Sequence, residues 1–130
     1  MIKRFSLLAG ALLVLSGVAA AEPVTVPGFE VKTFLNGRTA NCVKTKDNST
    51  CDTYFAEDGS VKRYTFDDQK LRKGKWWVDD KGLLNVQWTG KKRPLKFSVV
   101  DPGTGSWELR KKKKLKALIT GATPGDHIKN

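Results

Sequence analysis

The residues of this sequence best suited to binding chemistry are its cations, which gather toward the C-terminus. From position 91 onward, 11 basic residues stand against 3 acidic ones, whereas residues 22–90 carry 11 against 10. Clustered positive charge attracts polyanions such as anionic polymers and lipid head groups. The sequence therefore predicts a basic binding surface in the C-terminal third. Its candidate residues are Lys91, Lys92, Arg93, Lys96, Arg110, Lys111, Lys112, Lys113, Lys114 and Lys116, with Trp107 as an aromatic neighbour suited to stacking.

The basic surface also fits a structural role, and the protein as a whole has an alternative function. Lysines on an edge strand prevent edge-to-edge aggregation, so the run from Lys111 to Lys114 also fits a protective, solvated edge. The alternative function is recognition of another protein, as an inhibitor or an envelope-associated interaction protein. Because lysine outnumbers arginine in this region, we expect diffuse attraction rather than bidentate phosphate recognition.

The sequence contains few residues that could take part in catalysis. The only histidine, His127, lies three residues from the C-terminus, so Ser-His and Cys-His nucleophile schemes lack an interior base. Three carboxylate pairs, Glu57-Asp58, Asp67-Asp68 and Asp79-Asp80, stand in turn-like segments and are interpreted as solvated turn residues. We therefore predict a non-enzymatic protein with no catalytic residue, no metal site and no cofactor.

The N-terminus has the pattern of a secretory signal peptide. Lys3 and Arg4 precede an uncharged apolar run, and Ala19-Ala20-Ala21 supplies a cleavage site before Glu22. The run is shorter than the roughly 20 residues that a membrane anchor, the alternative, would need. Residues 1–21 are thus predicted to be a signal peptide. We expect a bacterial periplasmic or secreted protein that has no transmembrane span after cleavage and does not bind intracellular nucleic acid.

The cysteine count fits an oxidising compartment. Cys42 and Cys51 are the only cysteines, and such a pair normally closes outside the cytoplasm. The polar segment between them predicts a disulfide across a hairpin, worth about 2.5–3 kcal/mol by loop-closure entropy. A redox pair, the alternative, would favour a two-residue spacing.

The elements that must position these residues are short strands. Turn sequences such as Asp58-Gly59 and Asp79-Asp80-Lys81-Gly82 recur every 8–12 residues or so. This spacing predicts one all-β domain over residues 22–130, an antiparallel meander forming a barrel or a sandwich, with a short N-terminal helical turn within 29–35. Residues 111–119 carry the only other hint of a helical period, and residues 121–126 are expected to be irregular.

Two strand-level expectations concern the basic surface and the tryptophans. If strands at 95–99 and 107–109 pair as a hairpin around Asp101-Pro102-Gly103, the two lysine groups form one patch. Trp76 and Trp77 are adjacent, so on a strand one faces the core and the other faces outward. Trp88 shares a face with the apolar residues Leu84 and Val86, and we expect it in the core.

The order of short motifs resembles a domain-of-unknown-function family of small exported bacterial proteins with a lipocalin-like β-meander. The resemblance covers most of the chain after the leader. It implies a fold but no activity and no site. The motifs that carry it are Leu35-Asn36-Gly37-Arg38-Thr39, Tyr54-Phe55-Ala56-Glu57-Asp58-Gly59, Gly74-Lys75-Trp76-Trp77-Val78, Leu84-Asn85-Val86-Gln87-Trp88 and the tail Ile119 to Asp126.

Overall fold

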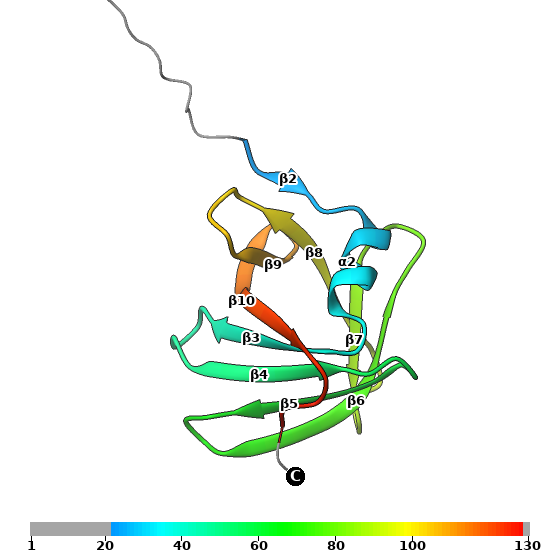
Figure 1. The fold of residues 1–130 in the computed structure, drawn as a ribbon, viewed down its shortest axis with the longest axis vertical. Coiled ribbons are helices and arrows are strands. Elements are labelled where there is room, and N and C mark those ends of the chain that lie inside the picture. Colours follow the sequence, from blue (N-terminus) through cyan, green and yellow to red (C-terminus); the bar gives the residue numbers. More distant parts are fainter. Residues whose placement is uncertain (1–21, 129–130) are drawn as a thin grey trace, which may run out of the picture.

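Between residues 22 and 128, the part of the chain described by the computed structural model, nine strands and one short helix form (Figure 1). The predicted signal peptide, residues 1–21, lies outside the described residues. The elements are β2 (Val24–Thr25), α2 (Gly28–Leu35), β3 (Arg38–Lys44), β4 (Thr50–Phe55), β5 (Ser60–Thr65), β6 (Lys70–Val78), β7 (Leu84–Trp88), β8 (Leu95–Asp101), β9 (Trp107–Lys111) and β10 (Lys114–Pro124).

The strands close into an antiparallel barrel. Each strand from β3 to β10 pairs with its successor, and β10 pairs back with β3. The predicted β8–β9 hairpin is present, with Val99 opposite Leu109. The short β2 adds to β8 opposite Val100 and Asp101. The all-β meander is therefore confirmed, and of the two architectures left open by the sequence the chain adopts the barrel.

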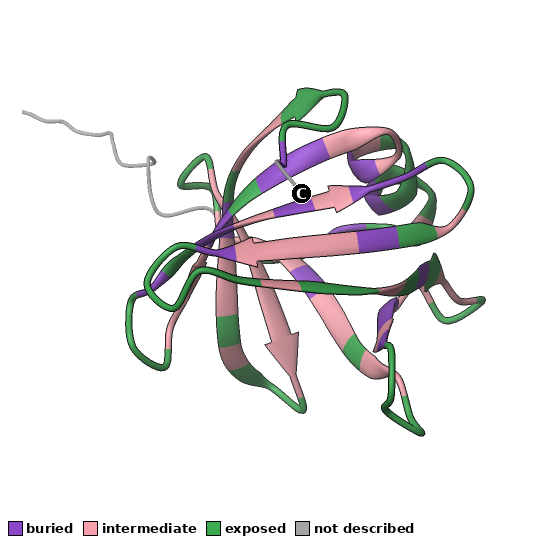
Figure 2. Ribbon diagram, turned by 90° about the horizontal axis from the view of Figure 1, so that it is seen from below, coloured by how far each residue is buried: buried purple, intermediate pink, exposed green. Residues whose placement is uncertain are grey.

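Period-two alternation directs the apolar side chains into the barrel. Leu84, Val86 and Trp88 are all buried, as their shared strand face predicted. On β6, Trp76 is buried whereas Trp77 is 39% exposed, so the two adjacent indoles face opposite sides. Figure 2 shows the buried residues as short stretches that interrupt the strands. The core thus lies inside the barrel, with no second layer of structure among the described residues.

Helix α2 closes one end of the barrel, called here the closed end. Its Val31 and Leu35 are fully buried in the same cluster as the inward-facing strand residues. The ring of Phe34 lies 4.5 Å from that of Trp107, centroid to centroid. The closed end contains the start of β3 and the end of β6. At the opposite end, the open end, lie the turns 45–49, 66–69, 89–94 and 112–113.

In the C-terminal region the hint of a helical period does not correspond to a helix, and one expectation was wrong. Residues 111–119 form the end of β9, a two-residue turn and the start of β10 rather than a helix. Residues 121–124, expected to be irregular, continue β10 and pair with the start of β3. The register of β10 against β3 shifts between Ile119 and Gly121. This irregularity interrupts the period-two alternation, which is why the pattern did not identify the strand.

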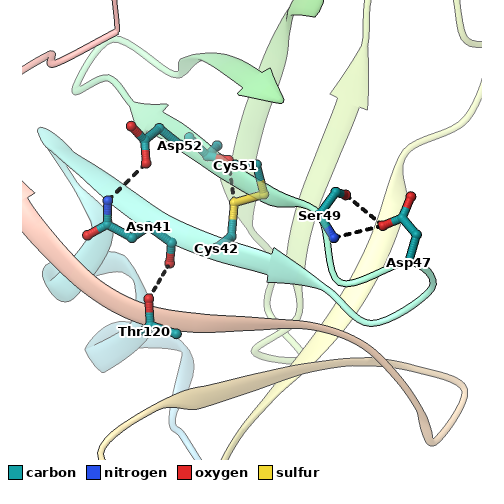
Figure 3. Close-up of a disulfide and its surroundings, with 8 residues drawn as sticks. Asn41, Cys42, Asp47, Ser49, Cys51, Asp52 and Thr120 are labelled. Atoms are coloured by element: carbon teal, nitrogen blue, oxygen red, sulfur yellow. Dashed lines mark hydrogen bonds between the residues drawn. A yellow bond between two sulfur atoms is a disulfide. The ribbon is translucent and has the colours of Figure 1, made fainter. Parts of the chain in front are cut away.

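The predicted disulfide is confirmed as a link between neighbouring strands. Cys42 on β3 and Cys51 on β4 lie directly opposite each other, with their Cα atoms 4.9 Å apart (Figure 3). The turn between them is ordered by Asp47, whose carboxylate accepts hydrogen bonds from the backbone N–H and the hydroxyl of Ser49. The link therefore fixes the hairpin that forms one wall of the open end.

Candidate functional site

The barrel encloses a cavity of about 600 Å³. Its lining includes turn residues Thr45 and Lys46 and both sides of the β9–β10 hairpin, but no residue of α2. The cavity therefore opens at the open end and has its floor toward the helix. This volume lies within the range of pockets that enclose small organic ligands.

The walls of the cavity are mostly apolar. Side chains from β3, β4, β7, β8, β9 and β10 contribute, and the disulfide forms part of the wall. The uncharged lining residues are Ala40, Cys42, Thr45, Cys51, Thr53, Phe55, Leu84, Val86, Trp88, Leu95, Phe97, Leu109, Leu115, Ala117 and Ile119. Such a surface favours an apolar ligand over water, because burying apolar area contributes roughly 25 cal/mol per Å².

Positive charge surrounds the mouth of this cavity. Six cations and no carboxylate belong to the lining: Lys44, Lys46, Arg63, Lys111, Lys114 and Lys116. The strand register accounts for part of this ring, since Lys111 pairs with Lys114 across the last hairpin and Ala117 pairs with Lys44. An anion approaching the open end therefore meets cations from several strands at once.

Most of the cations predicted from the sequence lie at this end. Lys91, Lys92 and Arg93 are exposed in the turn between β7 and β8. Lys112 and Lys113 form the turn between β9 and β10 and are also exposed. The β8–β9 pairing brings these two turns to the same end of the barrel, as the sequence predicted.

Three of the predicted binding residues lie outside the two turns at the open end and contact other groups. Arg110 is bound to Glu108, with a nitrogen-to-oxygen distance of 2.6 Å. Lys96 is exposed and lies 3.9 Å from the carboxylate of Asp79. Trp107 packs against Phe34 at the closed end. The structure thus does not bring Trp107 together with the lysines.

The position of the lysine run does not match that of a protected edge. Strand β9 pairs with both β8 and β10, and β10 pairs with both β9 and β3. Lys112 and Lys113 moreover have φ angles of 51° and 70°, in the left-handed region. Hairpin turns of this kind prefer Asn-Gly, so the local backbone does not account for two lysines there.

Reasoning from the sequence missed a cluster formed by Arg63, Arg72 and Trp88, in which Arg63 and Trp88 line the cavity and Arg72 is exposed. The guanidinium carbon of Arg63 lies 4.7 Å from the ring centroid of Trp88, and that of Arg72 lies 5.8 Å from it. Arg63 and Arg72 are paired residues on β5 and β6. Their guanidinium groups therefore share one indole, a favourable arrangement for each cation but a repulsive one for the pair.

Two donors in this group are buried without a hydrogen-bond partner among residues 22–128. They are Nε of Arg63 and Nε1 of Trp88. Burial, reinforced by the nearby charge of Arg72, lowers the pKa of Arg63, and Asp68 opposes that shift. Because unpaired buried donors are unfavourable, these two atoms favour a hydrogen-bond acceptor that enters the cavity beside them.

The alternation of β5 could have revealed Arg63. Val61 and Thr65, two residues on either side of it, are both buried, so Arg63 belongs to the inward face of the strand. The sequence shows that these three share a face, but it does not show that barrel closure turns this face inward. Lys44 and Lys46 were missed because they lie far from the lysine run in the sequence.

The carboxylate pairs occupy turns, as predicted. The carboxylate of Asp58 accepts hydrogen bonds from the hydroxyl and the backbone N–H of Ser60, which lower its pKa. Asp79 accepts hydrogen bonds in the β6–β7 turn. His127 is exposed. These carboxylates serve the turns and do not face the cavity.

Comparison of the sequence with protein-family models and with curated proteins finds no match. Among residues 22–128, no helix is long and apolar enough to cross a membrane. The disulfide between Cys42 and Cys51 fits a protein of an oxidising compartment.

Proposed function

We propose that this protein is an exported, non-enzymatic binding module that receives an anionic small ligand through the open end of its barrel. One observation carries the proposal: a cavity of about 600 Å³ with apolar walls has six cations and no carboxylate in its lining. The apolar walls favour a ligand that leaves water, and the cations select its charge. A β-barrel of this size is compatible with such a role.

The test uses the anionic dye anilinonaphthalene sulfonate, whose fluorescence rises in apolar surroundings. We expect binding that weakens with salt, because screening reduces the attraction of the lysines. Ala117→Trp, which puts an indole into the cavity from β10, should abolish binding. Thr120→Trp changes an exposed residue of the same strand and is the matched control.

Folding of both variants is checked by their circular dichroism spectra and melting temperatures. A wild-type protein that does not bind the dye would contradict the proposal. Equal binding by the Ala117 variant and wild type would place the dye elsewhere and would also contradict it.

A second candidate function is attachment to an anionic polymer or membrane surface. The supporting observation is that two exposed cationic turns, 91–93 and 112–113, lie at the same end of the barrel. Diffuse lysine contacts of this kind give weak, salt-sensitive binding to anionic lipid head groups. Sedimentation with anionic and with neutral vesicles separates this function from occupation of the cavity, because the Ala117→Trp variant should still bind the vesicles.

Export is part of the proposal and has a direct measurement. N-terminal sequencing of the protein recovered from the periplasm or the medium should begin at Glu22 or Ala21. Recovery of a chain beginning at Met1 in the membrane fraction would instead indicate an uncleaved anchor.

A further inference from the structure

The geometry around Arg63 points to one class of ligand, and this inference rests on the proposed function. We infer that the barrel binds an amphiphile with a single carboxylate head on an apolar chain, and that Arg63 holds the carboxylate. The chain then extends toward the floor of the cavity, where Phe55, Leu84 and Phe97 lie.

Arg63 stands where an acid group and an apolar chain can both be accommodated. Along β5 it lies one inward position closer to the open end than Val61, which is 2% exposed and belongs to the buried core. Its guanidinium group contacts the indole of Trp88, the last residue of β7. The guanidinium therefore marks the boundary between the cationic mouth and the apolar interior.

The chemistry of the unpaired donors favours a carboxylate. The Nε–Nη edge of an arginine binds the two oxygens of a carboxylate side by side, and such bidentate pairs are among the strongest hydrogen bonds in proteins. In Arg63 the Nε atom is buried and has no hydrogen-bond partner among residues 22–128. The buried Nε1 of Trp88, also without a partner, supplies a further donor nearby.

The charges around Arg63 also favour a carboxylate as the bound group. The residues that line the cavity include no carboxylate that could neutralise Arg63. The neighbouring guanidinium of Arg72 faces the same indole and adds to the positive potential. Asp68, in the turn between β5 and β6, opposes this potential from outside the cavity lining. A carboxylate bound to Arg63 would replace an unfavourable pair of cations with an attractive cluster.

The test compares two ligands that differ only in the head group, dodecanoate and dodecanol, below the critical micelle concentration of dodecanoate. Their affinities are measured by displacement of the neutral dye N-phenylnaphthylamine from the purified protein. For wild type we expect dodecanoate to bind more tightly than dodecanol. In Arg63→Gln the affinity for dodecanoate should fall about 10- to 100-fold, the loss typical of a hydrogen bond to a charged group. Its affinity for dodecanol should change little.

Arg72→Gln is the matched control, because Arg72 contacts the same indole at a greater distance and does not line the cavity. Its effect on dodecanoate should be smaller than that of Arg63→Gln. Arg63→Lys keeps the charge but removes the bidentate edge, so it should restore only part of the affinity. Arg63→Gln should fold normally, because the substitution removes a half-buried cation without an ion-pair partner among residues 22–128.

Each outcome separates this inference from the function on which it rests. If wild type binds neither the dye nor dodecanoate, the proposed function fails. If both bind but Arg63→Gln leaves the preference for dodecanoate unchanged, the cavity binds ligands and the inference about Arg63 is wrong. Equal losses for dodecanoate and dodecanol would show that Arg63 only shapes the cavity, which also overturns the inference.

Discussion

The two ends of the barrel share the same strands but are filled in opposite ways. At the closed end the interior is occupied by protein, with Val31 and Leu35 of the helix fully buried. At the open end the same barrel encloses a cavity of about 600 Å³, whose rim is cationic. Stability and binding are therefore separated along the barrel axis. Shortening an apolar side chain at the closed end should therefore change mainly the free energy of unfolding, and shortening one at the open end should change mainly the affinity for a ligand.

The closed end also contains the polar contacts that order its turns. Asp79 accepts hydrogen bonds from the backbone N–H of Lys81 and Leu83 and from the side chain of Asn85. Gly28, at the start of α2, lies so close to Gly82 that a Cβ built on it would be 2.9 Å from the Gly82 Cα. The helix and the β6–β7 turn are therefore packed backbone against backbone.

The open end is constrained in addition by a covalent bond. The disulfide ties β3 to β4 beside the mouth and forms part of the cavity wall. The bond links the two strands where they border the cavity. The cavity can then stay available for a ligand.

The largest effect on stability is expected at Leu35. Leu35→Ala removes a fully buried side chain of helix α2 from the core, so it should lower the free energy of unfolding by about 2–5 kcal/mol. Leu115→Ala changes a half-buried leucine of the cavity wall and should lower it by about 1 kcal/mol. Urea unfolding of both variants measures the difference. Equal losses would contradict the division between the two ends.

The next largest effect concerns the disulfide. Replacing Cys42 and Cys51 by Ser should lower the free energy of unfolding by about 2.5 kcal/mol, because the loop closed by the bond is released in the unfolded chain. Affinity for a cavity ligand should fall as well, since the β3–β4 wall loses its constraint. A variant that loses stability but keeps full affinity would show that the bond does not shape the cavity. Reduction of the wild-type protein offers the same comparison without substitution.

The sequence predicted the succession of strands better than it predicted the interior of the barrel. Alternation in Leu84, Val86 and Trp88 identified a buried strand face, and the two cysteines identified a hairpin. The cavity could not be predicted, because its volume depends on how far the opposite walls of a closed barrel stand apart. Closure also decides that Arg63 points inward.

The residues of the cationic rim also divide into those that the sequence identifies and those whose position depends on how the strands pair. The lysines of 91–93 and 111–114 were identified from charge density alone, a property visible in the sequence. Lys44 and Lys46 join the same rim only because β3 pairs with β10. Trp107 was included because of its position near the lysines in the chain, whereas the strand β9 carries it to the opposite end, against Phe34.

A smaller effect is expected from the pH dependence of Asp79. Hydrogen bonds from Asn85 and from the backbone N–H of Leu83 hold the pKa of Asp79 below its usual 3.8. Because the carboxylate is favoured in the folded state, its contribution to stability is present above the usual pKa and is lost as pH falls through the lowered one. The melting temperature should therefore fall between about pH 5 and pH 2.

Asp79→Asn should remove part of this acid sensitivity while lowering the melting temperature near neutral pH. The exposed neighbour Asp80, changed to Asn, is the matched control and should leave the profile close to wild type. Coincident profiles of wild type and the Asp79 variant would mean that the β6–β7 turn does not titrate with folding.

The smallest effect on stability is expected at the tip of the last hairpin. Lys112→Asn with Lys113→Gly places the preferred residues in a turn whose φ angles are 51° and 70°, so stability should be unchanged or rise by up to about 1 kcal/mol.

The same change removes two exposed charges, so binding to anionic vesicles at low salt should weaken. Lys91→Asn with Lys92→Gln removes two charges from the neighbouring turn and should weaken vesicle binding to a similar degree. If neither variant loses vesicle binding, the exposed lysines play no part in surface attachment. If only the hairpin variant aggregates, its lysines keep the protein soluble rather than bind a ligand, and the functional charge at the open end is confined to the residues that line the cavity.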